Sequence, residues 1–152
     1  MKITLLSLFF LSIAAHAHQV VTIADGDTMT LLVDQKPLKI RLANIDAPEK
    51  KQPFGQRSKE SLSKLCWGKD AKYVTETIDK YKRTVAVVFC DGAQVHKVQV
   101  ALGMAWVYPK YNKDSNLPAL QQAAKLTGLG LWADPHPLSP WEWRKAQKVP
   151  MR

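Results

Sequence analysis

Acidic residues gather in two short segments of a chain that is otherwise strongly basic. Asp25-Gly26-Asp27 separates two stretches of β-forming residues, and Asp46-Ala47-Pro48-Glu49 follows a third. Because Pro48 favours extended backbone at Ala47, Asp46 and Glu49 cannot share one helical turn. Two carboxylates and the Ala47 carbonyl are hard oxygen ligands that suit Ca²⁺ or Mg²⁺ and leave room for water. Taken singly, the first segment is better explained as a plain hairpin turn and the second as a turn or a helix start.

Two basic features accompany these acids along the chain. Arg41 stands in an alternating stretch five residues before Asp46, and the charged segment 79–84 precedes another apolar stretch. A planar guanidinium can donate two parallel hydrogen bonds to a phosphate group. Each feature alone is also compatible with an ordinary solvated strand face or an exposed charged loop.

The composition favours one basic globular domain. The chain has 152 residues, with 22 Lys and Arg against 13 Asp and Glu, a formal charge of +9. Its balance of apolar and charged residues excludes wholesale disorder, collagen-like repeats and a coiled coil. A net positive field favours anionic partners, which include nucleic acid, an anionic membrane and an acidic protein.

The first 17 residues are of a different kind. Lys2 is their one charge, residues 3–15 are nearly all apolar, and Ala15-His16-Ala17 resembles a cleavage site. About 13 apolar residues are too few to cross roughly 30 Å of hydrocarbon, which argues against a membrane anchor. We therefore expect a signal peptide over 1–17, cleavage between Ala17 and His18, and a secreted or periplasmic domain over 18–152.

Export would place Cys66 and Cys90 in an oxidising compartment, where we expect them to form a disulfide. The bond would close a loop of about 25 residues and contribute roughly 3 kcal/mol in the chain-entropy treatment. Two buried free thiols remain the alternative.

The apolar periodicity predicts five strands and three helices. The strands run over 20–23, 29–33, 38–42, 71–77 and 84–90. One helix spans 55–66, a second is centred on Val98 and ends at Gly103, and a third is centred on Leu120. This pattern favours a five-stranded OB-fold barrel plus three α-helices, over about 20–132. The Pro- and Trp-rich tail, 133–152, should lie over the surface, where it either clamps the barrel or contacts substrate.

The order of these motifs closely resembles the staphylococcal nuclease family. The resemblance rests on Asp25-Gly26-Asp27, on Arg41 with Asp46-Ala47-Pro48-Glu49, and on Asp79-Lys80-Tyr81-Lys82-Arg83, and it extends to Trp132. It implies a five-stranded OB barrel with three helices. It also implies a Ca²⁺-dependent phosphodiesterase that acts on DNA and RNA and leaves 3′-phosphate and 5′-hydroxyl ends.

The resemblance also assigns roles to residues. It implies Arg41, Glu49 and Arg83 as catalytic residues, and Asp27, Asp46 and the Ala47 carbonyl as Ca²⁺ ligands, with Asp25 behind them. It places Tyr81, Trp106 and Tyr108 around the nucleotide, and Lys80 and neighbouring lysines beside the backbone phosphates. Trp106 is alternatively a core residue.

Three departures from the family pattern stand out. Lys82 replaces a usual glycine, the pair His96-Lys97 replaces Asn-Glu, and Ala47 replaces a common threonine. A backbone ligand at Ala47 survives its change. The other two put the loop that carries Arg83 and the stability of the second helix in question.

Two other classes of function compete with the enzyme. A non-catalytic nucleic-acid-binding OB module would share the basic barrel but would be free to lose several of the five residues Asp27, Arg41, Asp46, Glu49 and Arg83. A membrane-binding or interaction protein would need an amphipathic basic helix, which the sequence does not offer. We expect a monomer with no stable membrane association.

Overall fold

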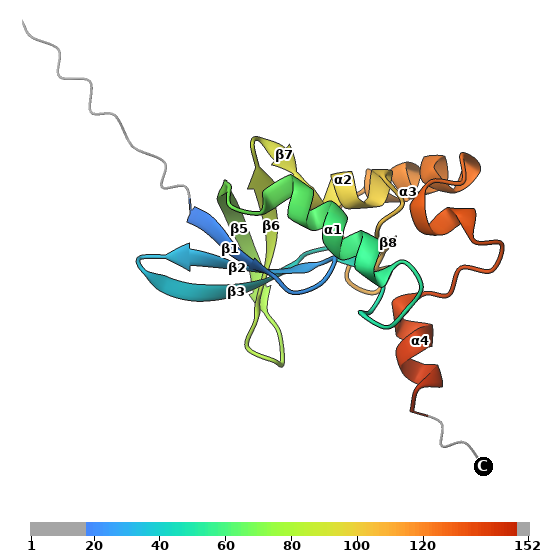
Figure 1. Cartoon of the computed structure of the whole chain (residues 1–152), viewed down its shortest axis with the longest axis horizontal. Coiled ribbons are helices and arrows are strands. Elements are labelled where there is room, and N and C mark those ends of the chain that lie inside the picture. The colour runs from blue at the N-terminus through green and yellow to red at the C-terminus, as the bar shows by residue number, and fades with distance from the viewer. Residues whose placement is uncertain (1–17, 149–152) are drawn as a thin grey trace, which may run out of the picture.

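Five strands close into a barrel (Figure 1) in the computed structural model, which describes residues 18–148. They are β1 (His18–Ile23), β2 (Thr28–Val33), β3 (Lys36–Leu42), β5 (Asp70–Ile78) and β6 (Thr84–Cys90). The order is β3-β2-β1-β5-β6, and a parallel pairing of β3 with β6 joins the two edges. The predicted barrel is therefore confirmed, whereas the predicted signal peptide, 1–17, and its cleavage point lie outside the described residues.

Strand alternation explains which side chains fill the barrel. Ile40 and Leu42 on β3, with Met29 and Leu31 on β2, are fully buried, while the residues between them are more exposed. Since side chains alternate along a strand, Arg41 stands on the opposite face from Ile40 and Leu42. The apolar positions of the hairpin therefore also decide where Arg41 lies.

Three short strands complete the sheets. β7 (Ala93–Gln94) pairs antiparallel with the end of β6. β4 (Ile45–Asp46) pairs with β8 (Trp106–Val107) in a separate two-stranded sheet. In this second sheet Asp46 is opposite Trp106. Two residues 60 positions apart in the chain are thereby placed side by side.

The described chain contains four α-helices, not the three predicted. The expected helices are α1 (Gly55–Cys66), α2 (Val95–Ala101) and α3 (Leu117–Leu126). The tail adds a 3₁₀ helix, η1 (Gly130–Ala133), and α4 (Pro140–Ala146). A capping box between Ser139 and Glu142, with Pro140 in the first turn, starts α4. These residues gave a helix signal in the sequence that the tail's Pro and Trp content obscured.

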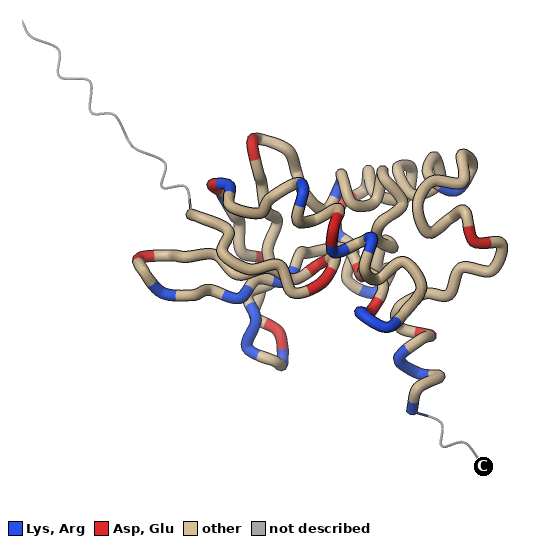
Figure 2. Tube along the Cα trace, viewed as in Figure 1, with Lys and Arg blue, Asp and Glu red and all other residues tan. Residues whose placement is uncertain are grey.

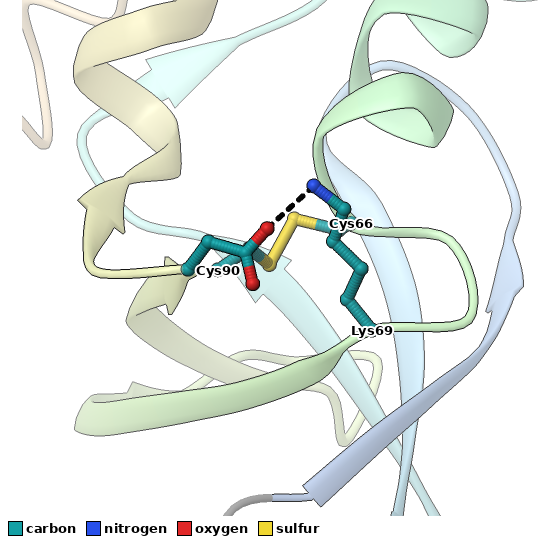
Figure 3. The surroundings of a disulfide bond; sticks show 4 residues. Cys66, Lys69 and Cys90 are labelled. Carbon is teal, nitrogen blue, oxygen red and sulfur yellow. Dashed lines mark hydrogen bonds and ion pairs between the residues drawn. A yellow bond between two sulfur atoms is a disulfide. The ribbon is translucent and has the colours of Figure 1, made fainter.

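Within residues 18–148, no helix is long and apolar enough to cross a membrane. Helix α1 packs on the barrel through Leu62 and Cys66. Cys66 is joined by a disulfide to Cys90 at the end of β6, as predicted (Figure 3). Both cysteines are buried, and an exposed ion pair between Lys69 and Asp91 lies beside them. The bond ties the last turn of α1 to the barrel wall.

Replacing both Cys66 and Cys90 by Ser should lower the free energy of unfolding by about 3 kcal/mol, because the unfolded chain regains the entropy of a loop of about 25 residues. Urea denaturation of the oxidised wild type and the variant measures this. Alkylation of the unreduced, denatured wild type should label no cysteine. Two labelled cysteines would disprove the bond.

Asp114 anchors the start of α3 to α2. Its Oδ2 lies 3.2 Å from Nε2 of the buried His96 and 3.3 Å from Nζ of Lys97. Burial alone would raise the pKa of Asp114, but hydrogen bonds from Asn116, His96 and Lys97 lower it from its ordinary 3.8 to about 2. His96 and Lys97 thus serve a structural contact in place of the family's Asn-Glu pair.

Asp114→Asn should destabilise the fold by about 1–2 kcal/mol at pH 7. A carboxylate whose pKa is depressed by folding contributes stability above its unfolded pKa, so the deficit should disappear as pH falls from about 4 to 2. Urea unfolding across this range measures it, with Asp91→Asn, at the exposed pair, as control. A deficit that does not change with pH would contradict the assignment.

Candidate active site

The loop between β1 and β2 carries Asp27 into a buried position. Its Oδ2 accepts a hydrogen bond from the Ala47 amide at 2.9 Å, and its Oδ1 accepts one from the Thr28 hydroxyl at 2.9 Å. Gly26 is required beside it, because a Cβ there would overlap the Ser58 side chain. The buried Gln99 donates from Nε2 to the Gly26 carbonyl at 2.8 Å. Backbone and helix together therefore fix this acidic loop.

Arg41 lies between two carboxylates. Its Nη2 is 2.9 Å from Asp46 Oδ1 and 3.5 Å from Asp27 Oδ2. Its Nη1 donates to the Ile45 carbonyl at 3.0 Å, which holds the guanidinium in one orientation. The strand β3, the turn after it and the β1–β2 loop thus bring three of the predicted site residues into direct contact.

The pKa values of this region reflect crowded negative charge. Burial, and then the neighbouring Asp27, raise the pKa of Asp25 to about 6. Burial also raises the pKa of Asp46, although hydrogen bonds and charge from Arg144 and Arg41 oppose the rise. The Arg41 guanidinium shows the converse: burial lowers its pKa, but Asp27 and Asp46 more than restore it. A bound cation would relieve the same crowding.

Glu49 reaches this region from a loop that is held at both ends. Its amide donates to Gln52 Oε1 at 3.1 Å, and its carbonyl accepts from the Gln52 amide at 2.9 Å. Gly55, the first residue of α1, lies so close that a Cβ there would overlap the Glu49 carbonyl. Gln52 and Gly55, neither of which the sequence singled out, therefore position Glu49.

Arg144 of α4 joins Glu49 to Asp46. Its Nη1 is 2.7 Å from Glu49 Oε1, and its Nη2 is 2.7 Å from Asp46 Oδ2. The two carboxylates raise the pKa of the Arg144 guanidinium against the lowering effect of burial. Sequence reasoning missed Arg144, which lies 98 positions from Asp46. We call Asp27, Asp46 and Glu49, which Arg41 and Arg144 connect, the acidic cluster.

Arg83 is placed differently. Its Nε and Nη2 contact Asp79 Oδ2 at 2.8 and 2.7 Å, and within residues 18–148 no hydrogen bond or ion pair joins it to the acidic cluster. The parallel register pairs Arg41 with Val85, two residues after Arg83. Arg83 therefore immediately precedes β6, the strand that pairs with β3 of Arg41, while its side chain is held by its own loop.

The loop around Arg83 also carries the predicted substrate residues Lys80 and Tyr81. Tyr81 is 68% exposed, with Lys80 Nζ 5.0 Å and the Arg83 guanidinium carbon 5.5 Å from its ring centroid. Lys82 adopts a left-handed conformation with φ of 61°. That explains why glycine suits this position in the family pattern. Figure 2 shows the basic positions of this loop, of the β2–β3 hairpin and of α4 around acidic positions nearer the centre.

The other two predicted aromatic substrate residues, Trp106 and Tyr108, lie beside the cluster but differ in their contacts. Trp106 is half-buried, with its ring centroid 4.4 Å from that of Trp132, and it packs on the second, smaller apolar core. Tyr108 has the Arg41 guanidinium carbon 6.0 Å from its ring centroid, and its ring is stacked against Trp141 of α4. Trp106 is thus partly a packing residue, whereas Tyr108 adjoins the charged groups.

The donor atoms suit a hard divalent cation in kind. Asp27 and Asp46 both lie within 3.5 Å of one guanidinium nitrogen, so their oxygens already flank a positively charged atom. The Ala47 backbone adjoins them, although its amide rather than its carbonyl contacts Asp27. No group of three or more His, Cys, Asp and Glu side chains in residues 18–148 is arranged to hold a metal ion. A cation here would take two carboxylates and complete its shell with backbone or water oxygens.

Comparison with known proteins gives consistent similarities. Residues 39–134 match the family described as Staphylococcal nuclease homologue. A Haemophilus influenzae protein named "Uncharacterized endonuclease" is 44% identical over 134 residues, 88% of this chain and 75% of that protein. The "Micrococcal nuclease" of Shigella flexneri is 38% identical over 141 residues, 86% and 81% of the two chains. The "Staphylococcal-like nuclease CAN1" of Arabidopsis thaliana is 39% identical over 113 residues, 74% of this chain and 35% of that one.

Gly55→Ala should displace the Glu49 loop, because the new methyl group meets backbone atoms that cannot rotate away. We expect a loss of about 1–3 kcal/mol in the free energy of unfolding, as for other overpacked sites. We also expect faster amide hydrogen exchange over 49–54. Lys64→Ala, an exposed change on the same helix, is the control. Equal stability and exchange in wild type and Gly55→Ala would refute the close approach.

Proposed function

The chain belongs to the staphylococcal nuclease family and is a nuclease, and we propose that it hydrolyses the phosphodiester bonds of both DNA and RNA in a Ca²⁺-dependent reaction. The observation that carries the proposal is the acidic cluster with Arg41. Three carboxylates and a buried guanidinium from separate elements meet in one place within a basic molecule. Such a site attracts both a cation and a polyanion.

Calcium would be held by the carboxylates of Asp27 and Asp46 with the Ala47 carbonyl, which are oxygen donors of the kind it prefers. When bound, it would supply Lewis-acid polarisation of a phosphate oxygen and a template for the substrate. Arg41 already occupies a place between the two carboxylates and forms ion pairs with both. The residues therefore fit the cation by charge and by donor type.

Glu49 and the two arginines perform the protein's part of the chemistry. Glu49, half-exposed at the edge of the cluster, orients the attacking water and accepts its proton. Arg41 and Arg83 donate to the phosphate oxygens on which negative charge grows during attack. Arg83 must exchange its contacts with Asp79 for contacts with phosphate, and its exposed loop allows that movement. Cleavage of the bond to the 5′ oxygen leaves 3′-phosphate and 5′-hydroxyl ends.

Substrate binding would use the aromatic and basic residues around the cluster. Tyr108 and Trp106 offer ring faces to a base, and stacking of this kind contributes about 1–3 kcal/mol per base without sequence preference. Lys80 and Tyr81 lie on the exposed loop of Arg83, where they can follow the backbone. We further propose that the protein acts as a monomer, after cleavage of residues 1–17, outside the cytoplasm.

The purified protein should degrade single- and double-stranded DNA and RNA with added Ca²⁺ and stop on addition of a chelator. Glu49→Gln and Arg83→Ala should each lower the rate at least about 100-fold while the fold is retained, because each removes a group that acts in the transition state. Gel assays at fixed protein concentration, with end-labelled products, measure rate and end chemistry.

Lys64→Ala controls for handling and should cleave like the wild type. Circular dichroism and thermal unfolding of each variant verify folding. Undiminished activity in Glu49→Gln or Arg83→Ala would contradict the site assignment. Tight nucleic-acid binding with no cleavage under any cation would support the non-catalytic OB module instead.

A further inference from the structure

The tail helix α4 places a cationic side chain on the residues proposed to bind calcium and to activate water. Arg144 donates to Asp46 Oδ2 and Glu49 Oε1 at 2.7 Å each, and a third contact to Asp46 Oδ1 measures 3.3 Å. The guanidinium therefore uses both oxygens of Asp46. A cation that takes Asp46 as a ligand must compete with Arg144 for the same lone pairs.

The same helix places an aromatic ring on the residue proposed to bind a base. Trp141 and Tyr108 are stacked with an interplanar angle of 4° and a centroid separation of 5.3 Å. The Trp106 ring meets Trp141 edge-on at 5.7 Å. The stack of Trp141 on Tyr108 is the offset parallel arrangement that a nucleobase adopts on an aromatic side chain. One face of Tyr108 is thereby covered by the protein's own indole.

Few other contacts hold α4. Within this seven-residue helix, all of which is described, Pro140 alone is fully buried. The preceding segment is tied to the Glu49 loop by one hydrogen bond, from Gln52 Nε2 to the Leu138 carbonyl at 2.7 Å. A cavity of about 170 Å³, lined in part by Pro48, Trp106 and Trp143, separates this segment from the body of the protein. Figure 1 shows α4 apart from α1, α2 and α3.

The helix also lies C-terminal to residues 39–134, the segment that matches the family model. Arg144 and Trp141 therefore reach the site from the chain beyond that segment. Arg144 pairs by its charge with carboxylates that a cation would use, and Trp141 stacks on the ring that a base would use. Two independent contacts of this kind on one short helix point to a common purpose.

We propose that α4 is an autoinhibitory strap, in which Arg144 competes with calcium for Asp46 and Glu49 and Trp141 competes with a base for Tyr108. This inference rests on the proposed function. Binding of the cation and of nucleic acid displaces the helix, so the strap sets the calcium concentration at which the enzyme becomes active. The competing interpretation makes Arg144 a positioning residue for Glu49, and Trp141 part of the substrate platform.

The two interpretations predict changes of opposite sign. If the strap is engaged in nine of ten molecules, its release should tighten apparent calcium binding about 10-fold, since affinity scales with the competent fraction. Isothermal titration of the full chain with Ca²⁺ should show this for Arg144→Gln. Lys145→Gln removes the exposed charge of the adjacent residue on the same helix and should change the affinity for Ca²⁺ less than about 2-fold. Arg144→Lys, which keeps the charge but loses the planar fork, should lie between wild type and Arg144→Gln.

Two further measurements follow the helix itself. Amide hydrogen exchange over 140–146 should speed up when Ca²⁺ is added to the wild type, while exchange over 25–28 and 45–49 slows. In a chelator, Trp141→Ala should bind a short single-stranded DNA more tightly than the wild type, because Tyr108 is uncovered. Weaker binding by Trp141→Ala would assign Trp141 to the substrate platform and overturn its part in the strap.

Calcium affinity that is unchanged or weaker in Arg144→Gln, in a folded protein, would overturn the strap and assign Arg144 to positioning. The proposed function fails separately from the strap. If Arg144→Gln binds calcium more tightly but no nucleic acid is cleaved, the strap stands and the proposed calcium-dependent reaction falls. If the wild type cleaves with calcium and Arg144→Gln shows no gain in affinity, the reverse holds.

Discussion

Confinement of negative charge is the constraint on which the other features of this molecule depend. Asp27 and Asp46 are both nearly inaccessible to water, and Asp25, which accepts a hydrogen bond from the Asp27 amide, has its pKa raised to about 6. Buried carboxylates are stable only when they are paired and hydrogen-bonded. Arg41 meets that demand for Asp27 and Asp46 and stays charged at any physiological pH. A neutral side chain at position 41 would leave Asp27 without its guanidinium partner and Asp46 paired with Arg144 alone.

The barrel provides this pairing through contacts that are distant in sequence. The β3–β6 pairing closes the barrel beside Arg41, and the β4–β8 pairing sets Asp46 opposite Trp106. Gln99 of α2 fixes the loop of Asp27 from a third direction. Because no single element holds the site, its geometry exists only when the whole barrel has formed. A change that destabilises the barrel is therefore also expected to disturb the geometry of the site.

Local patterns in the sequence predicted the parts of this arrangement that local physics decides. Strand alternation placed Arg41 on the face opposite Ile40, and the Asp-Gly turn carried Asp27. The expected export to an oxidising compartment predicted the disulfide that the structure contains. The contact of Arg83 with Asp79 is also local, since the two are four residues apart. The sequence analysis did not predict this pairing, because it assigned Arg83 to catalysis by resemblance.

The contacts of Arg144 and Trp141 could not be predicted in the same way. Both belong to a helix of seven residues, and their partners lie far back in the chain. Nothing in the periodicity of such a helix indicates what its exposed side meets. The capping box at Ser139 indicates where the helix begins, but it does not indicate which part of the protein the helix packs against.

The exposure of the two guanidinium groups decides which of them can yield to a cation. The Arg41 side chain is 15% exposed and is fixed by backbone carbonyls as well as by carboxylates, so its removal would leave buried charges unpaired. The Arg144 side chain is 39% exposed and its partner Glu49 is 41% exposed, so water and salt screen that contact, whereas its other partner, Asp46, is 3% exposed. Exposed ion pairs contribute about 0–1 kcal/mol. The three carboxylates of the acidic cluster face two guanidinium charges, so exchange of Arg144 for a divalent cation would bring the group to neutrality. The singly charged Arg144, on a helix with few other contacts, is thus suited to occupy the cation site and to be displaced by a divalent ion.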